Sequence, residues 1–129
     1  MIEEWKDLEG YEGIYQVSNM GVVRSVDRVV HARRKYTLKG KVLKQASNGN
    51  YNFVCLEVNG TKKNLYIHRA VAEHFVPNPE NLSQVNHKDE NKLNNRADNL
   101  EWCTPKYNAN YGSRNQKISK TLRNERSTE

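Results

Sequence analysis

The sequence predicts an α+β fold, in which a small N-terminal antiparallel sheet is joined by a short helix to a β, loop, β, α unit. Three observations predict it. The N-terminal half alternates apolar and polar residues between turn-forming pairs, as strands in hairpins do. Ile67–Phe75 suits a short helix that ends before Pro77-Asn78-Pro79. After this helix, two short apolar runs flank a long polar segment.

Turn-forming sequences divide the N-terminal half into hairpins. Ser18-Asn19-Met20-Gly21 separates β-like runs at Ile14–Val17 and Val22–Val26. Further alternating runs predict strands at Lys41–Gln45, Tyr51–Val58 and Lys62–Tyr66. Asn59-Gly60 joins the last two, and Asn-Gly is the strongest short signal for a hairpin. The intervening segment, His31–Gly40, is predicted to be a basic loop.

The C-terminal unit is predicted from polar residues between two short apolar runs. Strand, polar loop and returning strand are expected at Gln84–His87, Lys88–Asp98 and Leu100–Cys103. Thr104 can cap a following helix, with Pro105 in its first turn. That helix would run to about Tyr111 and carry Asn108 on its second turn. Such a unit can hold a strand histidine opposite a helix residue across a cleft wide enough for a cation and a phosphate.

A zinc site is not expected, either from the two cysteines or from the histidines of the linking helix. Cys55 and Cys103 make no CxxC pair, and both are expected to be small, semi-buried apolar residues. His68 and His74 are six residues apart, which places them on separate helix faces. We expect His68 to pack or to form hydrogen bonds, and His74 to be exposed to solvent.

The distribution of charge points to a polyanionic partner. Residues 3–12 are acidic, whereas residues 24–63 and the C-terminal tail are basic, and the net charge is +6. Each basic cluster alone could be ordinary solvated surface, but two clusters flanking a unit with room for a cation and a phosphate favour a nucleic acid, DNA or RNA. The candidate DNA contacts are Arg33, Arg34, Lys35, Lys39, Lys44, Tyr51, Arg114, Lys117 and Lys120.

Length and composition limit the class of protein. The 129 residues suit one domain or two very small ones with a shared core, and a mean hydropathy of −0.98 indicates a thin core. No apolar run approaches the length of a membrane span, and the acidic start is unlike a signal peptide. We therefore expect a cytoplasmic protein, acting as a monomer without a small-molecule cofactor.

The segment from Val85 to Asn108, VNHKDENKLNNRADNLEWCTPKYN, holds the candidate chemistry. A neutral imidazole such as that of His87 can take a proton from water near pH 7. Asparagines such as Asn99 and Asn108 can hold a loop through the backbone or offer an amide oxygen to a hard cation. Composition alone favours a long polar turn over a catalytic site, since Asn and Asp side chains satisfy local backbone groups.

The sequence resembles the HNH endonucleases of phages and mobile introns. The residues that carry the resemblance are IHRAVAEHFVPNP, VNHKDENKLNN and NLEWCT, while EEWKDLEGYEGIYQVSNMGVVRS resembles the small module that often precedes this domain in homing endonucleases. The resemblance covers most of the chain. It implies a ββα-metal (His-Me finger) fold and three regions: a DNA-binding β module at 1–65, a nuclease domain at 66–112 and a basic tail at 113–129.

The resemblance also implies roles for individual residues. His87 would be the general base, Asn99 its brace and Asn108 a metal ligand on the helix, with Asn94 and Asn95 as competitors for the bracing role. One divalent cation is implied, Mg²⁺ or Mn²⁺, together with double-stranded DNA as the partner. The products would carry 5′-phosphate and 3′-hydroxyl ends.

One position departs from the stronger form of the family pattern, which has a carboxylate as second metal ligand just before the histidine. Here that position is Asn86, whose amide adds no negative charge. Asp89 is an alternative ligand. The same departure leaves open a second interpretation, a DNA-binding or regulatory protein that keeps the fold without cleaving. The tail could form a basic helix over Ser113–Asn124 or be frayed.

Overall fold

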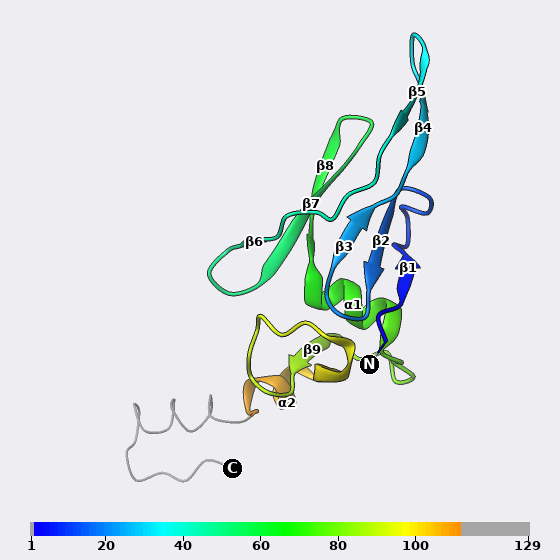
Figure 1. Ribbon diagram of the computed structural model, residues 1–129. Helices are drawn as coiled ribbons and strands as arrows, with labels where there is room; N and C mark the ends of the chain where they lie inside the picture. Colours follow the sequence, from blue (N-terminus) through cyan, green and yellow to red (C-terminus); the bar gives the residue numbers. More distant parts are fainter. Residues whose placement is uncertain (1, 112–129) are drawn as a thin grey trace, which may run out of the picture.

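The computed structural model describes residues 2–111, and its N-terminal half consists of small antiparallel sheets (Figure 1). The first sheet has the strand order β1-β2-β3, at Trp5–Asp7, Tyr15–Ser18 and Val23–Ser25. The predicted hairpin at this place is confirmed. Strand β1 was not predicted, because it has a single large apolar residue, Trp5, in an acidic segment. The ring of Trp5 lies 3.8 Å from the guanidinium carbon of Arg24 on β3.

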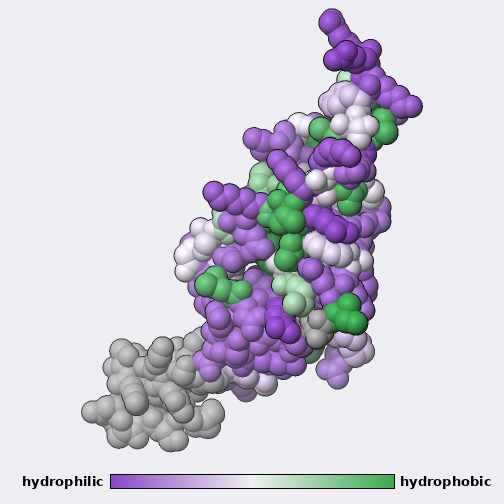
Figure 2. Space-filling view, in the orientation of Figure 1, coloured by the Kyte–Doolittle hydropathy of each residue, from purple (hydrophilic) through white to green (hydrophobic). Residues whose placement is uncertain are grey.

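The predicted basic loop at His31–Gly40 is wrong, because this region forms a hairpin. Strand β4 (Arg28–His31) pairs with β5 (Lys35–Leu38), and Val30 lies opposite Tyr36. The hairpin extends away from the body of the protein, and its end is strongly hydrophilic (Figures 1 and 2). With β5 exposed along its whole length, no buried face imposes an apolar alternation that the sequence could reveal.

The predicted strand at Lys41–Gln45 is also wrong. This segment crosses the edge of β3 and makes one isolated bridge, between Val42 and Arg24. Its backbone bonds to β3 are those from Ser25 N to the Lys41 carbonyl, 2.8 Å, and from Leu43 N to the Val23 carbonyl, 2.9 Å. The segment leads into the next sheet and does not add a strand to the first sheet.

The third sheet confirms the two remaining predicted strands. Its order is β6-β7-β8, at Ala46–Ser47, Asn52–Val58 and Thr61–Tyr66. Asn59 and Gly60 join β7 to β8 with φ angles of 52° and 81°. Two positive φ angles are the signature of the type I′ turn, which matches the twist of the flanking strands.

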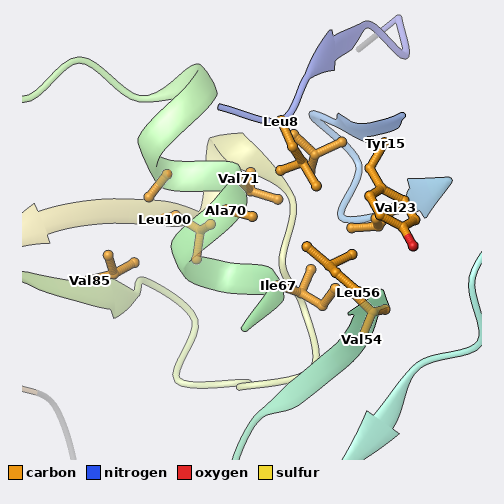
Figure 3. Close-up of a cluster of buried hydrophobic side chains, with 12 residues drawn as sticks. Leu8, Tyr15, Val23, Val54, Leu56, Ile67, Ala70, Val71, Val85 and Leu100 are labelled. Atoms are coloured by element: carbon orange, nitrogen blue, oxygen red, sulfur yellow. The ribbon is translucent and has the colours of Figure 1, made fainter. Parts of the chain in front are cut away.

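One hydrophobic core joins both halves of the chain. Helix α1 (Ile67–Phe75), which begins and ends where the sequence predicts, lies between the N-terminal sheets and the C-terminal unit (Figure 1). Its buried residues pack with side chains from both sides (Figure 3). The labelled core residues are Leu8, Tyr15, Val23, Val54, Leu56, Ile67, Ala70, Val71, Val85 and Leu100. Regions 1–65 and 66–112 therefore share their core. No helix within residues 2–111 is long and apolar enough to cross a membrane.

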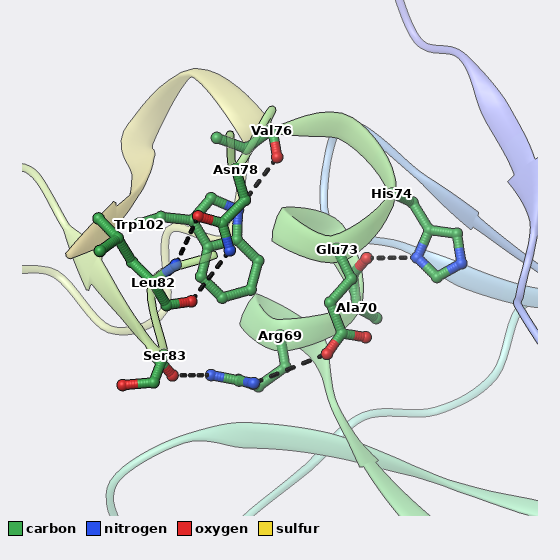
Figure 4. A network of polar contacts seen from close by, with 9 residues as sticks. All are labelled: Arg69, Ala70, Glu73, His74, Val76, Asn78, Leu82, Ser83 and Trp102. Atoms are coloured by element: carbon green, nitrogen blue, oxygen red, sulfur yellow. Dashed lines mark hydrogen bonds and ion pairs between the residues drawn. The ribbon is translucent and has the colours of Figure 1, made fainter. Parts of the chain in front are cut away.

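The connection from α1 to the C-terminal unit is held by side chain to backbone hydrogen bonds (Figure 4). The indole of Trp102 donates to the Val76 carbonyl at 3.0 Å. The Asn78 amide accepts from the backbone N–H of Leu82 at 2.8 Å and donates to its carbonyl at 2.9 Å. Because Trp102 belongs to the returning strand, these bonds fix the hairpin of the C-terminal unit against the end of α1.

Two side chains lie differently from the sequence prediction. His74 is partly buried rather than solvent-exposed: its Nδ1 donates to the Ala70 carbonyl at 2.7 Å, and its Nε2 accepts from the Glu9 backbone at 3.0 Å. The N-terminal segment covers this end of α1, which helical spacing cannot show. Cys55 is exposed because alternate residues of β7 face the core, whereas Cys103 is buried.

Candidate functional site

The predicted β, loop, β, α unit is confirmed. Strand β9 (Gln84–His87) pairs with β10 (Leu100–Cys103), and helix α2 (Pro105–Ala109) follows. The Thr104 hydroxyl caps α2 by accepting from the Tyr107 backbone at 3.1 Å. One face of this hairpin packs on α1 through the core, and the other meets α2. Adjacent strand residues therefore face two different environments.

His87 lies on the face toward α1, with 5% of its surface exposed. Its Nε2 is 2.7 Å from the Asn95 side-chain oxygen. An amide oxygen only accepts hydrogen bonds, so Nε2 carries the hydrogen and the basic lone pair lies on Nδ1. Asn95, which the sequence offered only as a competitor of Asn99, thus sets the tautomer of the imidazole.

Asn99 holds the loop that follows His87. It lies in the short 3₁₀ turn η1 (Ala97–Asn99). Its side-chain oxygen accepts from the Asp89 backbone at 3.1 Å, and its amide nitrogen donates to the Asp89 carboxylate at 2.9 Å and to the Asn94 carbonyl at 2.8 Å. Its own carbonyl accepts from Lys88 N at 2.8 Å. Asn99 therefore closes the loop, whereas Asn95 contacts the imidazole.

The carboxylate of Asp89, the alternative metal ligand, accepts hydrogen bonds from within the loop. Its Oδ1 accepts from the Asn91 backbone at 2.8 Å, and its Oδ2 accepts from the Asn94 amide at 2.9 Å. The hydrogen bond from the Asn94 side chain, followed by that from the Asn91 backbone, lowers the pKa of Asp89. Both oxygens of this carboxylate thus organise the loop.

A column of rings lies against His87. Tyr51 stacks on His68 of α1 with ring centroids 4.5 Å apart, and the centroid of His68 is 5.4 Å from that of His87. Burial, and then the proximity of His87, lower the pKa of His68 from 6.5 to about 4. His68 is therefore neutral at physiological pH. His68 has only 8% of its surface exposed, as expected of a side chain that packs within the fold.

The low pKa of His68 predicts a loss of stability in mild acid. In the unfolded chain His68 binds a proton near pH 6.5, whereas in the folded chain it does so only near pH 4. The free energy of unfolding is therefore highest above pH 6.5 and decreases as the pH falls below it. The expected loss between pH 7 and pH 5 is about 2 kcal/mol of unfolding free energy. Urea denaturation of wild type and His68→Phe at both pH values measures it. Equal pH dependence in the two proteins would contradict the prediction.

The face toward α2 carries the candidate metal ligands. The Asn86 amide nitrogen donates to Glu101 Oε2 at 2.7 Å, and that of Asn108 donates to Gln84 Oε1 at 3.3 Å. The NH₂ end of each amide thus faces an acceptor on the hairpin, and its oxygen faces away from that acceptor. Hard oxygen donors of this kind fit Mg²⁺ or Mn²⁺. Among residues 2–111, no three His, Cys, Asp or Glu side chains group as a metal site.

The first sheet supports the residue that holds His87. The Asn19 carbonyl accepts from Ala97 N at 2.8 Å, which ties the β2–β3 turn to the loop. In the same turn, Gly21 has a φ of +86°, and a Cβ there would lie 3.0 Å from the Asn95 carbonyl oxygen. The glycine therefore allows the turn to approach the backbone of Asn95 closely.

Gly21→Ala is expected to impair the site through Asn95. The positive φ of an alanine costs roughly 1 kcal/mol of folding free energy. Because the added Cβ also displaces Asn95, we expect the rate of DNA cleavage to fall at least about tenfold, with DNA affinity unchanged. Gly10→Ala is the matched control, because Gly10 has the same φ of +86° with nothing within 4 Å of its Cβ position. A similar loss in both variants would mean that backbone strain alone is responsible.

Of the candidate DNA contacts, Tyr51 lies near His87, with ring centroids 6.3 Å apart, whereas those on the β4–β5 hairpin lie far from it (Figure 1). Arg33, Arg34 and Lys35 lie at the end of the β4–β5 hairpin, which Figure 1 shows at the opposite end of the protein from β9 and α2. Lys39 pairs with Asp27 at 3.8 Å. The structure places Tyr51 beside His68 and leaves Lys44 exposed. Arg114, Lys117, Lys120 and the predicted tail helix lie outside the described residues.

Sequence reasoning missed the role of Glu101. It is the acidic residue in the apolar run of β10, and equal strand lengths put it opposite Asn86. Pairing the two predicted strands from their loop-side ends, His87 with Leu100, would have revealed the pair. The partnership of His87 and Asn95 has no such signal, because several asparagines in the loop are equivalent by sequence.

The C-terminal unit combines a histidine on a strand, a loop closed by asparagine side chains and an asparagine on the following helix. Residues 65–110 match the HNH endonuclease family, and residues 3–57 match the NUMOD4 motif. The chain belongs to the HNH endonuclease family. The resemblance seen in its sequence is therefore confirmed.

Individual relatives agree with this assignment. The chain is 43% identical over 106 residues to the DNA endonuclease I-HmuI of Bacillus phage SP01, covering 81% of this chain and 55% of that protein. It is 38% identical over 115 residues to the uncharacterized HNH endonuclease L245 of Acanthamoeba polyphaga mimivirus, covering 89% and 31%. The chain thus spans about a third to a half of their length.

A solved structure of the HNH homing endonuclease I-HmuI, described as showing DNA binding and cleavage, matches the fold. The TM-score is 0.66 at 38% sequence identity, and the match covers 91% of this chain and 66% of that one. An α+β fold with small antiparallel sheets is thus common to both.

Proposed function

We propose that this protein is a metal-dependent endonuclease that hydrolyses phosphodiester bonds of double-stranded DNA, leaving 5′-phosphate and 3′-hydroxyl ends. The observation that carries the proposal is the bond between His87 Nε2 and the Asn95 oxygen, 2.7 Å, because it leaves the imidazole basic at Nδ1. Membership of the HNH endonuclease family supports the same chemistry.

In this proposal His87 is the general base. Its Nδ1 takes a proton from the water that attacks the phosphorus, which is the task of a neutral imidazole near pH 7. Neutral His68 beside it adds no positive charge that would oppose proton uptake. Asn99 maintains the loop geometry around His87 through its bonds to Asp89 and Asn94.

Asn86 and Asn108 are the proposed metal ligands. The bound cation, Mg²⁺ or Mn²⁺, supplies positive charge for the phosphate and the leaving 3′ oxygen. Within the described part of the chain β9 pairs with β10 alone. We place the scissile phosphate at the other edge of β9, since only there can groups on both faces, His87 and Asn86, reach one substrate.

The β4–β5 hairpin is the proposed DNA contact distant from the site. A two-stranded ribbon fits the major groove, and the end of this one carries adjacent cationic side chains. Because the hairpin and the C-terminal unit lie at opposite ends of the protein (Figure 1), both would engage one duplex over an extended length.

Removing the charges of the hairpin should weaken binding in a salt-dependent way. Each phosphate contact contributes about 0.9 to the slope of log affinity against log salt concentration, so Arg33→Ala/Arg34→Ala/Lys35→Ala should flatten the slope by up to about 2.7. Fluorescence anisotropy of labelled duplex over a salt series measures this. Thr37→Ala, on the same hairpin, is the uncharged control. An unchanged slope in the triple variant would exclude the hairpin as a phosphate contact.

The second candidate function is DNA binding or regulation without cleavage. The observation that favours it is the neutral Asn86 at a position where the family pattern has a carboxylate. Gel shifts of linear DNA in EDTA, followed by addition of Mg²⁺ or Mn²⁺, separate the two functions. We expect the bound DNA to be cut when metal is added, whereas intact bound DNA at saturating metal would favour the alternative.

A further inference from the structure

We propose that Glu101 is a positioning residue of the metal centre, which orients the Asn86 amide and supplies the negative charge that an asparagine lacks. This inference rests on the proposed function, since it concerns how the chain binds the cation used in cleavage. It assigns to Glu101 a role that the HNH motif itself does not contain.

The pairing of β9 with β10 brings the two side chains together. Glu101 lies directly opposite Asn86 in the register, so both project from the same face of the hairpin. Glu101 Oε2 is 2.7 Å from the amide nitrogen of Asn86, which is 2% exposed. A carboxylate only accepts hydrogen bonds, so the NH₂ end of this amide must face Glu101. The oxygen end therefore faces away from Glu101, and our proposal assigns this end to the cation.

Helix α2 orients Glu101 in turn. The Tyr107 hydroxyl donates to the same Oε2 at 3.2 Å, and the next residue, Asn108, is the second proposed ligand. The Asn108 amide donates its NH₂ end to Gln84, two residues before Asn86 on the same strand face. Both proposed ligands thus have the same orientation, in which the amide nitrogen donates a hydrogen bond to the hairpin.

The negative charge of Glu101 gives this side chain a proposed role in metal binding, in addition to its hydrogen bond with the buried amide of Asn86. Two amide ligands carry no net charge, and hard divalent cations bind weakly to neutral oxygens alone. A carboxylate bonded to the ligand itself polarises that amide and adds its own charge to the site. Partners of this type commonly account for about 10–100-fold in metal affinity. The carboxylate expected at position 86 is thus replaced by one across the strand pair.

The charge can be removed with its hydrogen bond retained. In Glu101→Gln the side-chain oxygen still accepts from Asn86, so a purely structural role predicts unchanged metal affinity. Our proposal predicts that half-saturating Tb³⁺, read as luminescence sensitised by the nearby tyrosine, rises at least about tenfold. Half-saturating Mn²⁺ for plasmid nicking should rise in parallel. Glu57→Gln, an exposed site on β7, is the matched control and should resemble wild type.

A charge exchange completes the test. Asn86→Asp/Glu101→Gln moves the carboxylate to the ligand position and keeps an amide and a carboxylate facing each other. We expect it to bring half-saturation back to within about threefold of wild type, and thermal melts of all variants check the fold. If Glu101→Gln does not fold, Tyr107→Phe, which releases one hydrogen bond to Glu101, should still weaken Mn²⁺ binding. Isothermal titration calorimetry measures this binding without a tyrosine sensitiser.

Two outcomes overturn the inference: wild-type affinity in Glu101→Gln, or a double variant no better than the single one. Failure of the proposed function is distinguishable, because wild type itself would then show neither saturable Tb³⁺ binding nor metal-dependent nicking.

Discussion

His87→Ala should abolish DNA cleavage and leave DNA binding intact. The change removes the imidazole whose Nδ1 we propose as acceptor of the proton of the attacking water, and general-base catalysis contributes about 10²–10⁴-fold to such reactions. The hairpin that we propose contacts DNA lies at the far end of the protein and keeps its charges (Figure 1). Single-turnover cleavage rates and gel-shift affinities, measured on the same DNA, separate the two effects.

The histidine must be shown to act chemically rather than by supporting the fold. His87 is buried and bonded to Asn95, so a thermal melt of the variant is needed beside the rates. His74→Gln is the matched control, because His74 is bonded within the fold through Ala70 and Glu9 and has no proposed part in cleavage. Equal cleavage by wild type and His87→Ala would exclude His87 as the base.

Asn108→Ala should be the second most damaging change. It removes one of the two proposed amide ligands, and we expect nicking to become undetectable at metal concentrations that saturate wild type, while DNA binding in EDTA persists. Loss of a ligand from an already neutral donor set leaves a single amide, which retains a hard cation poorly. Nicking over a series of Mn²⁺ concentrations measures the effect.

The position of Asn108 makes the result easy to interpret. Helix α2 contains no buried residue, so truncation there should cost little stability. Asn110→Ala, at the end of the same helix, is the matched control, because the structure gives it hydrogen bonds through the backbone. If nicking by Asn108→Ala saturates at the same Mn²⁺ concentration as nicking by wild type, Asn108 is not a ligand.

Elements with a buried face could be predicted from the sequence. Ile67–Phe75, Gln84–His87 and Leu100–Cys103 begin and end where their apolar patterns indicate, because each packs one face into the shared core. The Asn59-Gly60 turn was equally clear, since its φ angles favour those two residues. Local pattern and final packing agree at these places.

Elements without a buried face could not be predicted. The β4–β5 hairpin is largely exposed, so its strands show no alternation, and Lys41–Gln45 alternates without joining a ladder. For the site, spacing indicated His87, Asn99 and Asn108. Its supporting contacts, from Asn95, Glu101 and the β2–β3 turn, depend on strand register and packing, which a single sequence does not reveal.

The central claim is that this chain cuts DNA by metal-dependent hydrolysis. The most direct test is to incubate purified protein with supercoiled plasmid plus Mg²⁺ or Mn²⁺, with EDTA in parallel, and then treat the products with DNA ligase. We predict open circles or linear DNA only with metal, resealed by ligase because the ends carry 5′-phosphate and 3′-hydroxyl groups. Plasmid that stays supercoiled at saturating metal, or nicks that ligase cannot seal, would contradict the claim.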